Sequence, residues 1–153
     1  MSNSTNKYHY TECGLDNVYL MNGFEVTETP YGPGVIFHDV DGLHLAIGLQ
    51  LADQSAPLTG AEVRFLRHEL DLSQKVLAGL LGVDEQTVAR WEKNKATIPG
   101  PAQRLLAAFY REQANGDQGV AAALHRLSEL DAEIHRLMTL ARSSEDEWVV
   151  LAA

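Results

Sequence analysis

The residues whose types and spacing could do chemistry lie together near the middle of this chain. Gln86, Ala89, Arg90 and Lys93 are spaced 0, 3, 4 and 7, which places them on one face of a helix. Glutamine can pair in a bidentate manner with adenine, and arginine with guanine, in the major groove of DNA. The spacing therefore predicts a helix whose outer face reads base edges through Gln86 and Arg90.

Two helices joined by a sharp turn must hold that face in place. Ser73 can cap the first helix, and Gly82 can adopt the positive φ that ends it. Asp84 can cap the second helix, in which Val88 and Trp91 point away from the reading face and into a core. A bracing helix, a tight turn and a second helix presented to the major groove make a helix-turn-helix.

This stretch resembles the lambda-repressor and Cro-like helix-turn-helix family, also called the XRE family. Leu-Ser-Gln, Leu-Ala, Leu-Gly-Val and Val-Ala-Arg-Trp-Glu fall in register within residues 72–92, and the resemblance covers about residues 60–111. It implies an all-α DNA-binding domain of four or five helices, with a buried ion pair between Arg67 and Glu92. It also implies phosphate contacts from a set of polar side chains: Gln74, Thr87, Lys93, Asn94 and Lys95, with Lys75 a weaker candidate.

Asn94 and Glu85 are the two unusual residues of this stretch. Asn94 stands where the family usually has glycine after the second helix, and asparagine tolerates a left-handed φ best among the other residues. Glu85 is acidic near the expected DNA, and two interpretations are open. It complements the helix dipole, which we prefer, or it accepts a hydrogen bond from cytosine N4.

The sequence before and after the motif predicts further elements. Strands are expected over 8–11, 18–20, 24–26 and 35–37, with a hairpin turn at Asn22-Gly23, a turn over 31–34, and a helix over 43–52 packed on the strands. A linker is expected over 53–57. A capping box of Thr59 and Glu62 begins the first helix of the DNA-binding domain, and Pro101 suits the first turn of its last helix, with Leu105, Leu106 and Phe109 inward.

The last segment carries a heptad pattern. Val120, Leu127, Ile134 and Ala141 are spaced by seven, and Ala123, Leu130 and Leu137 fall three residues after the first three. This pattern predicts an amphipathic helix that either forms a dimeric coiled coil or packs on its own domain. We expect Trp148–Leu151 to pack as a terminal hook.

Charge and composition limit the class of protein. The chain has 153 residues and a net charge of −9, but residues 60–113 carry +1 while the flanks carry −6 and −4. Only the middle segment suits a polyanion, and bulk coating of nucleic acid is excluded. A single cysteine, Cys13, excludes a disulfide framework and a multi-thiolate zinc site. Because neither a membrane span nor an export signal is apparent, we expect a cytoplasmic protein.

The order of the segments is similar to that of MqsA-type antitoxins, in which a small zinc-binding domain precedes the helix-turn-helix. The two Cys-x-x-Cys pairs of that family do not carry over, because Tyr10, Cys13, Leu45 and Gly48 stand at the matching places. A substitute set of His9, Cys13, His38 and His44 has conceivable ligand spacings, but isolated histidines are more often surface residues. We therefore expect no metal and no cofactor.

Taken together, the sequence predicts an α+β protein. A small β-rich domain with one short helix (1–57) precedes an all-α helix-turn-helix domain (58–113) and a C-terminal amphipathic helix and tail (114–153). We expect no enzyme, since Asp39 and Asp41 fit a turn better than a carboxylate pair and no phosphate loop is present. The expected function is that of a homodimeric repressor that binds a palindromic double-stranded operator. The alternative is an antitoxin-like protein whose N-terminal domain neutralises a partner toxin.

Overall fold

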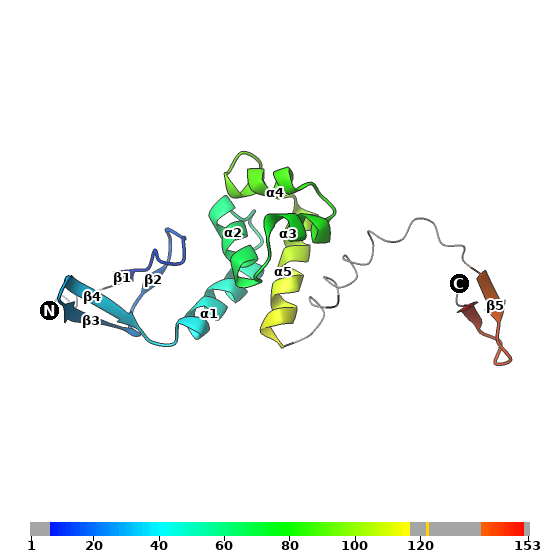
Figure 1. The fold of residues 1–153 in the computed structure, drawn as a ribbon, viewed down its shortest axis with the longest axis horizontal. Coiled ribbons are helices and arrows are strands. Elements are labelled where there is room, and N and C mark those ends of the chain that lie inside the picture. The colour runs from blue at the N-terminus through cyan, green and yellow to red at the C-terminus, as the bar shows by residue number, and fades with distance from the viewer. Residues whose placement is uncertain (1–6, 117–121, 123–138, 152–153) are drawn as a thin grey trace.

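The computed structural model describes residues 7–116, 122 and 139–151 of the chain. Four short strands come first, followed by five helices that cluster around one core, and the expected α+β class is confirmed (Figure 1). No helix among the described residues is long and apolar enough to span a membrane.

The strands form two separate antiparallel ribbons. β1 (Tyr8–His9) pairs with β2 (Tyr19–Leu20), and β3 (Phe24–Thr29) pairs with β4 (Gly32–Phe37) from Phe24↔Phe37 to Thr29↔Gly32. The expected hairpin turn at Asn22-Gly23 is wrong. The Gly23 carbonyl instead accepts a hydrogen bond from the His38 amide at 2.9 Å, which extends the β3–β4 ladder.

The tight turn of the second ribbon lies at Pro30-Tyr31, earlier than the expected turn over 31–34. Gly32, Pro33 and Gly34 lie inside β4. A proline is tolerated there because a two-stranded ribbon has two open edges, so the missing N–H need not break a ladder hydrogen bond. Aromatic rings hold the two ribbons together, with the Tyr8 centroid 5.2 Å from Phe24 and the Tyr10 centroid 5.0 Å from Phe37.

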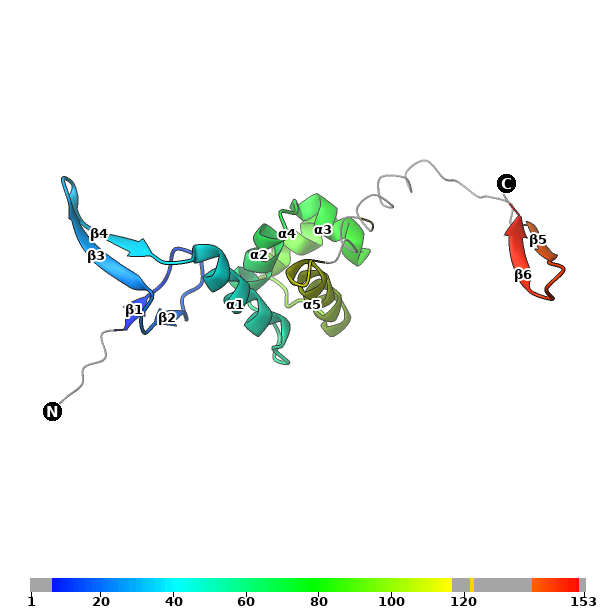
Figure 2. The same cartoon turned by 90° about the horizontal axis from the view of Figure 1, so that it is seen from below.

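Helix α1 (Val40–Ala52) leaves the strands and joins the helical cluster. Asp39 begins it, because its side chain accepts a hydrogen bond from the Gly42 amide at 3.0 Å. The helix packs mainly against α5 and α2 rather than on the strands as expected, and Figure 2 shows α1 alongside α5. Gly48 permits this approach, since a Cβ there would overlap the ring of Tyr110.

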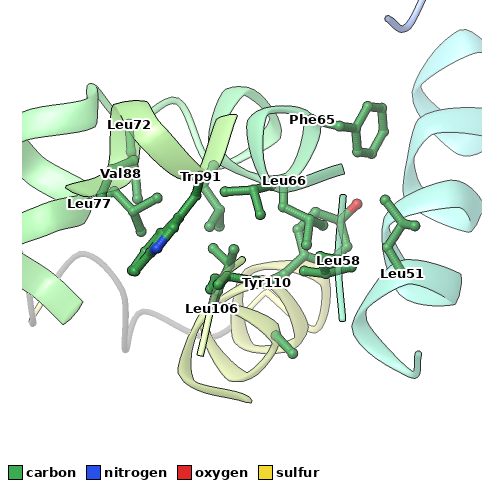
Figure 3. Close-up of a cluster of buried hydrophobic side chains, with 14 of the residues drawn as sticks. Leu51, Leu58, Phe65, Leu66, Leu72, Leu77, Val88, Trp91, Leu106 and Tyr110 are labelled. Atoms are coloured by element: carbon green, nitrogen blue, oxygen red, sulfur yellow. The ribbon is translucent and has the colours of Figure 1, made fainter. Parts of the chain in front are cut away.

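The remaining helices are α2 (Gly60–Glu69), α3 (Gln74–Leu81), α4 (Glu85–Glu92) and α5 (Gly100–Ala114). The expected capping box is confirmed, with Thr59 Oγ1 accepting from the Glu62 amide and Glu62 Oε1 accepting from the Thr59 amide. Figure 3 shows the core that these helices share. Its fully buried side chains come from α2 to α5: Val63, Leu66, Leu77, Val88 and Leu106.

Two details of α5 differ from expectation. Leu105 was expected to point inward but is 39% exposed, and Tyr110 is buried in its place. The reason is that α5 turns the stripe of Leu106, Ala107 and Tyr110 toward the other helices, which leaves Leu105 on the outer side.

Gln103, also on this helix, is buried and holds the segment of the expected linker in place. Its side chain accepts a hydrogen bond from the Leu58 amide and donates one to the Ala56 carbonyl, both at 2.9 Å.

The C-terminal residues that the structure describes form a hairpin rather than the end of a helix. β5 (Thr139–Arg142) pairs with β6 (Trp148–Leu151) in antiparallel register. Ala141, the last position of the expected heptad, therefore lies in a strand, where it alternates with exposed neighbours as a strand's two-residue period requires. The other heptad positions lie outside the described residues.

Candidate nucleic-acid interface

The helix-turn-helix is shaped by the way its helices end. α2, α3 and α4 are each followed by one residue in the left-handed region: Asp71 (φ 54°), Gly82 (φ 70°) and Asn94 (φ 56°). In each case the next amide reaches back five residues to a helix carbonyl, as Val83 does to Ala78 at 3.0 Å. These are Schellman closures, and they set the sharp changes of direction between α2, α3 and α4.

Helix α4 is fixed to the core through its inner face. Val88 is fully buried and Trp91 is 3% exposed, as expected from the sequence (Figure 3). Ser73 caps the preceding helix by accepting from the Val76 amide at 3.1 Å, whereas Asp84 begins α4 without a side-chain cap. Helix α4 therefore takes its position from packing and from side-chain pairs rather than from its own cap.

The strongest of these pairs joins Arg67 of α2 to Glu92 of α4. Arg67 Nε and Nη2 donate to the two carboxylate oxygens of Glu92, each at 2.8 Å, and the side chains are only 10% and 4% exposed. Arg67 Nη1 also donates to the Leu72 carbonyl at 2.9 Å. A single guanidinium thus connects α2, the loop before α3 and the end of α4, and the planar fork of arginine suits this geometry.

A second connection was not foreseen. A Cβ on Gly60 would lie 2.5 Å from the carbonyl oxygens of Trp91 and Glu92, so the start of α2 touches the end of α4 directly. The Asn94 side-chain oxygen accepts from the Gly60 amide at 2.8 Å. Asn94 therefore has a structural partner, and only its amide nitrogen is left for a ligand.

The outer face of α4 and the residues just after it present free polar groups. Gln86, Arg90, Lys93 and Lys95 are exposed, and Ala89 between them is half-buried. They line one shallow depression together with Ala96 (Figure 1, α4 at the upper edge of the helical cluster). Within the described part of the chain, these four polar side chains have no hydrogen bond or ion pair to protein groups. The face therefore carries three cations and one amide free for an external partner.

The other expected contact residues lie at the margins of this face. Gln74 is half-buried at the start of α3, and Thr87 is half-buried on α4. Glu85 and Lys75 are exposed, and Glu85 is the acidic residue in the first turn of α4, where it complements the helix dipole. Glu92, the other acid of α4, is paired with Arg67. The negative charge of Glu92 is thus neutralised by Arg67 and does not oppose the basic residues on the outer face of α4.

The histidines and the cysteine of the N-terminal segment are not brought to one point. His9 contacts the Asp16 carbonyl at 2.6 Å, His38 lies 3.5 Å from Glu25, and Cys13 is half-buried. Among the described residues, no group of three or more potential ligands is arranged to hold a metal ion.

His44 instead belongs to a polar chain at the joint between strands and helices. Its Nε2 lies 2.8 Å from the hydroxyl of Tyr10, and its Nδ1 lies 2.9 Å from a carboxylate oxygen of Glu69. Tyr10 is 2% exposed, and burial raises the pKa of its hydroxyl above the ordinary value. This polar chain links the residue that follows β1 to α1 and α2, and sequence reasoning missed it because the three residues are far apart in the sequence and belong to no local motif.

Comparison with known proteins adds one finding. Residues 63–118 match the family model described as helix-turn-helix. No curated protein and no solved structure gives a significant match to the chain. The match and the geometry agree that α3 and α4 form a helix-turn-helix, the motif of DNA-binding regulatory domains.

Proposed function

We propose that the chain is a sequence-specific, dimeric transcriptional repressor that reads its operator through α4. The observation that carries this proposal is the outer face of α4, where Gln86, Arg90, Lys93 and Lys95 are exposed and unpaired among the described residues. The opposite face is fixed by Val88, Trp91 and the Arg67–Glu92 pair, so the face is presented rigidly.

The proposed roles follow from reach and chemistry. Gln86 and Arg90 lie one turn apart on the face; the amide of Gln86 can donate to and accept from an adenine edge, and the guanidinium of Arg90 can donate to a guanine edge. Lys93 and Lys95 lie at the end of the helix, where they meet phosphates. Gln74 and Thr87 add contacts at the margin, and Asn94 contributes its amide nitrogen while its oxygen holds Gly60.

The small DNA-contacting surface of one domain supports the proposal of a dimer. One domain presents a single short recognition helix, and proteins of this architecture commonly read two half-sites about 34 Å apart, which is one turn of DNA. A dimer that covers a promoter in this way acts by occupancy. The acidic flanks of the chain must then face away from the DNA.

Selection of binding sites from random double-stranded DNA by the purified full-length chain tests this proposal. We expect an enriched inverted repeat whose half-site centres are about 10 base pairs apart. The variant Gln86→Ala/Arg90→Ala serves as control and should enrich no sequence, although it should still retain weak binding to any duplex. Failure of the unmodified chain to enrich a sequence would contradict the proposal.

A second candidate function is favoured by the β3–β4 ribbon. One face of the ribbon and its turn expose large apolar side chains, with Val26 at 65% on that face and Tyr31 fully exposed in the turn. Glu28 adds negative charge on the same face as Val26, and residues 1–59 carry −6 overall. An apolar surface beside acidic residues suits a basic protein partner, such as the toxin that an antitoxin-like chain neutralises.

Co-expression with the product of an adjacent gene tests this alternative. A small basic protein encoded there should form a complex with the chain, and its toxicity to cells should be suppressed. Val26→Glu should abolish the suppression while leaving DNA binding intact, and Thr27→Glu on the other side of the ribbon is the matched control. If neighbouring products neither bind nor inhibit growth, this candidate fails.

A further inference from the structure

The C-terminal hairpin exposes more apolar surface than a two-stranded ribbon can support alone. All four residues of β6 are exposed, with Trp148 at 67%, Val149 at 40%, Val150 at 65% and Leu151 at 46%. One edge of β6 pairs with β5, and no other strand among the described residues pairs with its second edge. An isolated ribbon of two short strands is marginally stable in water, and three or more strands are needed for a stable sheet.

We propose that β6 pairs with β6 of a second copy of the chain, which gives a four-stranded antiparallel sheet in the order β5, β6, partner β6, partner β5. This inference rests on the proposed dimeric function and names the surface that joins its two subunits. It differs from the expected coiled coil over 120–141, because the contact lies in residues 148–151.

The second copy is the occupant that the charges favour. β6 carries no charge, whereas β5 carries Arg142, and charged residues are a common means of blocking an open edge. The acidic residues of the hairpin, Glu145, Asp146 and Glu147, precede β6 in the turn. In an antiparallel pair of β6 strands the two acidic turns lie at opposite ends of the new sheet. Like charges are thus kept apart, although the chain as a whole is acidic.

Symmetry narrows the register of this pairing. A two-fold axis perpendicular to the sheet keeps equivalent faces on the same side, and residues directly opposite each other in an antiparallel pair also share a side. Each residue of β6 must therefore lie opposite a partner residue whose side chain points to the same face of the sheet. The axis passes between Val149 and its own copy or between Val150 and its own copy. In either case the faces with Leu140, Trp148 and Val150 combine into one largely apolar surface, on which Arg142 of β5 lies over the ring of Trp148.

The segment before the hairpin is long enough for the hairpins of two subunits to meet while both subunits contact DNA. Residues 115–138, which are 24 residues, separate the end of α5 at Ala114 from β5 at Thr139. A segment of this length can reach about 80 Å when fully extended. Two recognition helices can then lie about 34 Å apart on DNA while the two hairpins meet. The hairpin contact is therefore compatible with simultaneous reading of two half-sites.

Sedimentation of the full-length chain tests the interface without DNA. The unmodified chain should sediment at twice its mass of 16.8 kDa. Val149→Lys/Val150→Lys should weaken self-association by about tenfold or more, since the lysines of both copies meet across the axis. Thr139→Lys adds a charge on β5 and should leave the dimer unchanged. Circular dichroism should show that the helical content is the same in every variant.

Cysteine crosslinking supplies a second measurement that does not depend on a loss of association. In a Cys13→Ser background, either Val149→Cys or Val150→Cys should form an intermolecular disulfide rapidly, because the residue at the axis lies opposite its own copy within disulfide distance. Thr139→Cys should not.

Three results would overturn the inference: a monomeric unmodified chain at about 100 µM, a lysine variant that remains dimeric, or equal crosslinking at all three positions. None of these readouts involves DNA, and Arg90→Ala should leave all of them unchanged. Failure of the hairpin interface is therefore distinguishable from failure of DNA recognition.

Discussion

Replacing Arg67 should strongly destabilise the fold, because it breaks the buried ion pair that ties α4 to α2. In Arg67→Met the carboxylate of Glu92, which is only 4% exposed, loses both charged donors at 2.8 Å while it remains shielded from water. Breaking a buried ion pair from one side commonly costs about 3–5 kcal/mol, because the remaining charge is uncompensated. At about 4 °C per kcal/mol, Tm should fall by about 12–20 °C.

The double variant separates the desolvation penalty from the value of the pair. Arg67→Met/Glu92→Leu removes both charges, and replacement of a buried pair by apolar side chains of similar volume is often neutral or stabilising. The double variant should therefore be more stable than Arg67→Met. Urea unfolding followed by circular dichroism measures the free energy of unfolding of the unmodified chain, of Arg67→Met, of Glu92→Leu and of the double variant, with the slope checked for two-state behaviour. Additive single costs, or a cost below about 1 kcal/mol for Arg67→Met, would refute the reasoning.

Three further predictions concern other parts of the fold. Gly60→Ala should destabilise the chain by about 1–3 kcal/mol in urea unfolding, because its Cβ would lie 2.5 Å from two backbone oxygens of α4; Gly100→Ala, which meets open space, is the control. The chain should bind no stoichiometric zinc, and a chelator should leave Tm unchanged; one zinc per chain in elemental analysis would contradict this. Burial raises the pKa of Tyr10 above its ordinary value of 10.0, so the stability that this residue contributes is complete below pH 10 and is lost as pH rises through its folded pKa. Tyr10→Phe should therefore flatten the alkaline fall in Tm, whereas Tyr31→Phe at the exposed ribbon tip should not.

The helical half of the fold was predictable because its signals are local. The capping box at Thr59, the cap at Ser73 and the left-handed Gly82 each depend on residues within a few positions of one another. The buried pair of Val88 and Trp91 follows from helical spacing alone. Such features are decided by backbone geometry and side-chain period, which the sequence displays directly.

The strands and the joints between segments were less predictable because distant residues decide them. Asn22-Gly23 has the composition of a hairpin turn, yet the longer ladder between β3 and β4 forms across Pro30-Tyr31 instead. Gly60 shows no local sign that its backbone must touch the end of α4. Asn94 was expected to tolerate a left-handed φ, which it does, but its hydrogen bond to Gly60 spans 34 residues. Tertiary contacts of this kind override local preference.

The most direct test of the central claim compares Arg90→Ala and Lys95→Ala on a cognate duplex and a scrambled duplex across a salt series. Arg90→Ala should cost about 1–3 kcal/mol on the cognate duplex, have less effect on the scrambled one, and relax selectivity at one base position. Lys95→Ala should weaken both duplexes about equally and lower the salt slope by about one unit.

Arg104→Ala is the matched control for these two variants, since this exposed arginine of α5 lines a depression with Asp53 and Gln54 rather than the face of α4. It should change neither affinity. If Arg90→Ala weakens all sequences alike, Arg90 is a phosphate contact and the assignment of the reading face is wrong. If neither Arg90→Ala nor Lys95→Ala changes binding, α4 is not the element that meets DNA.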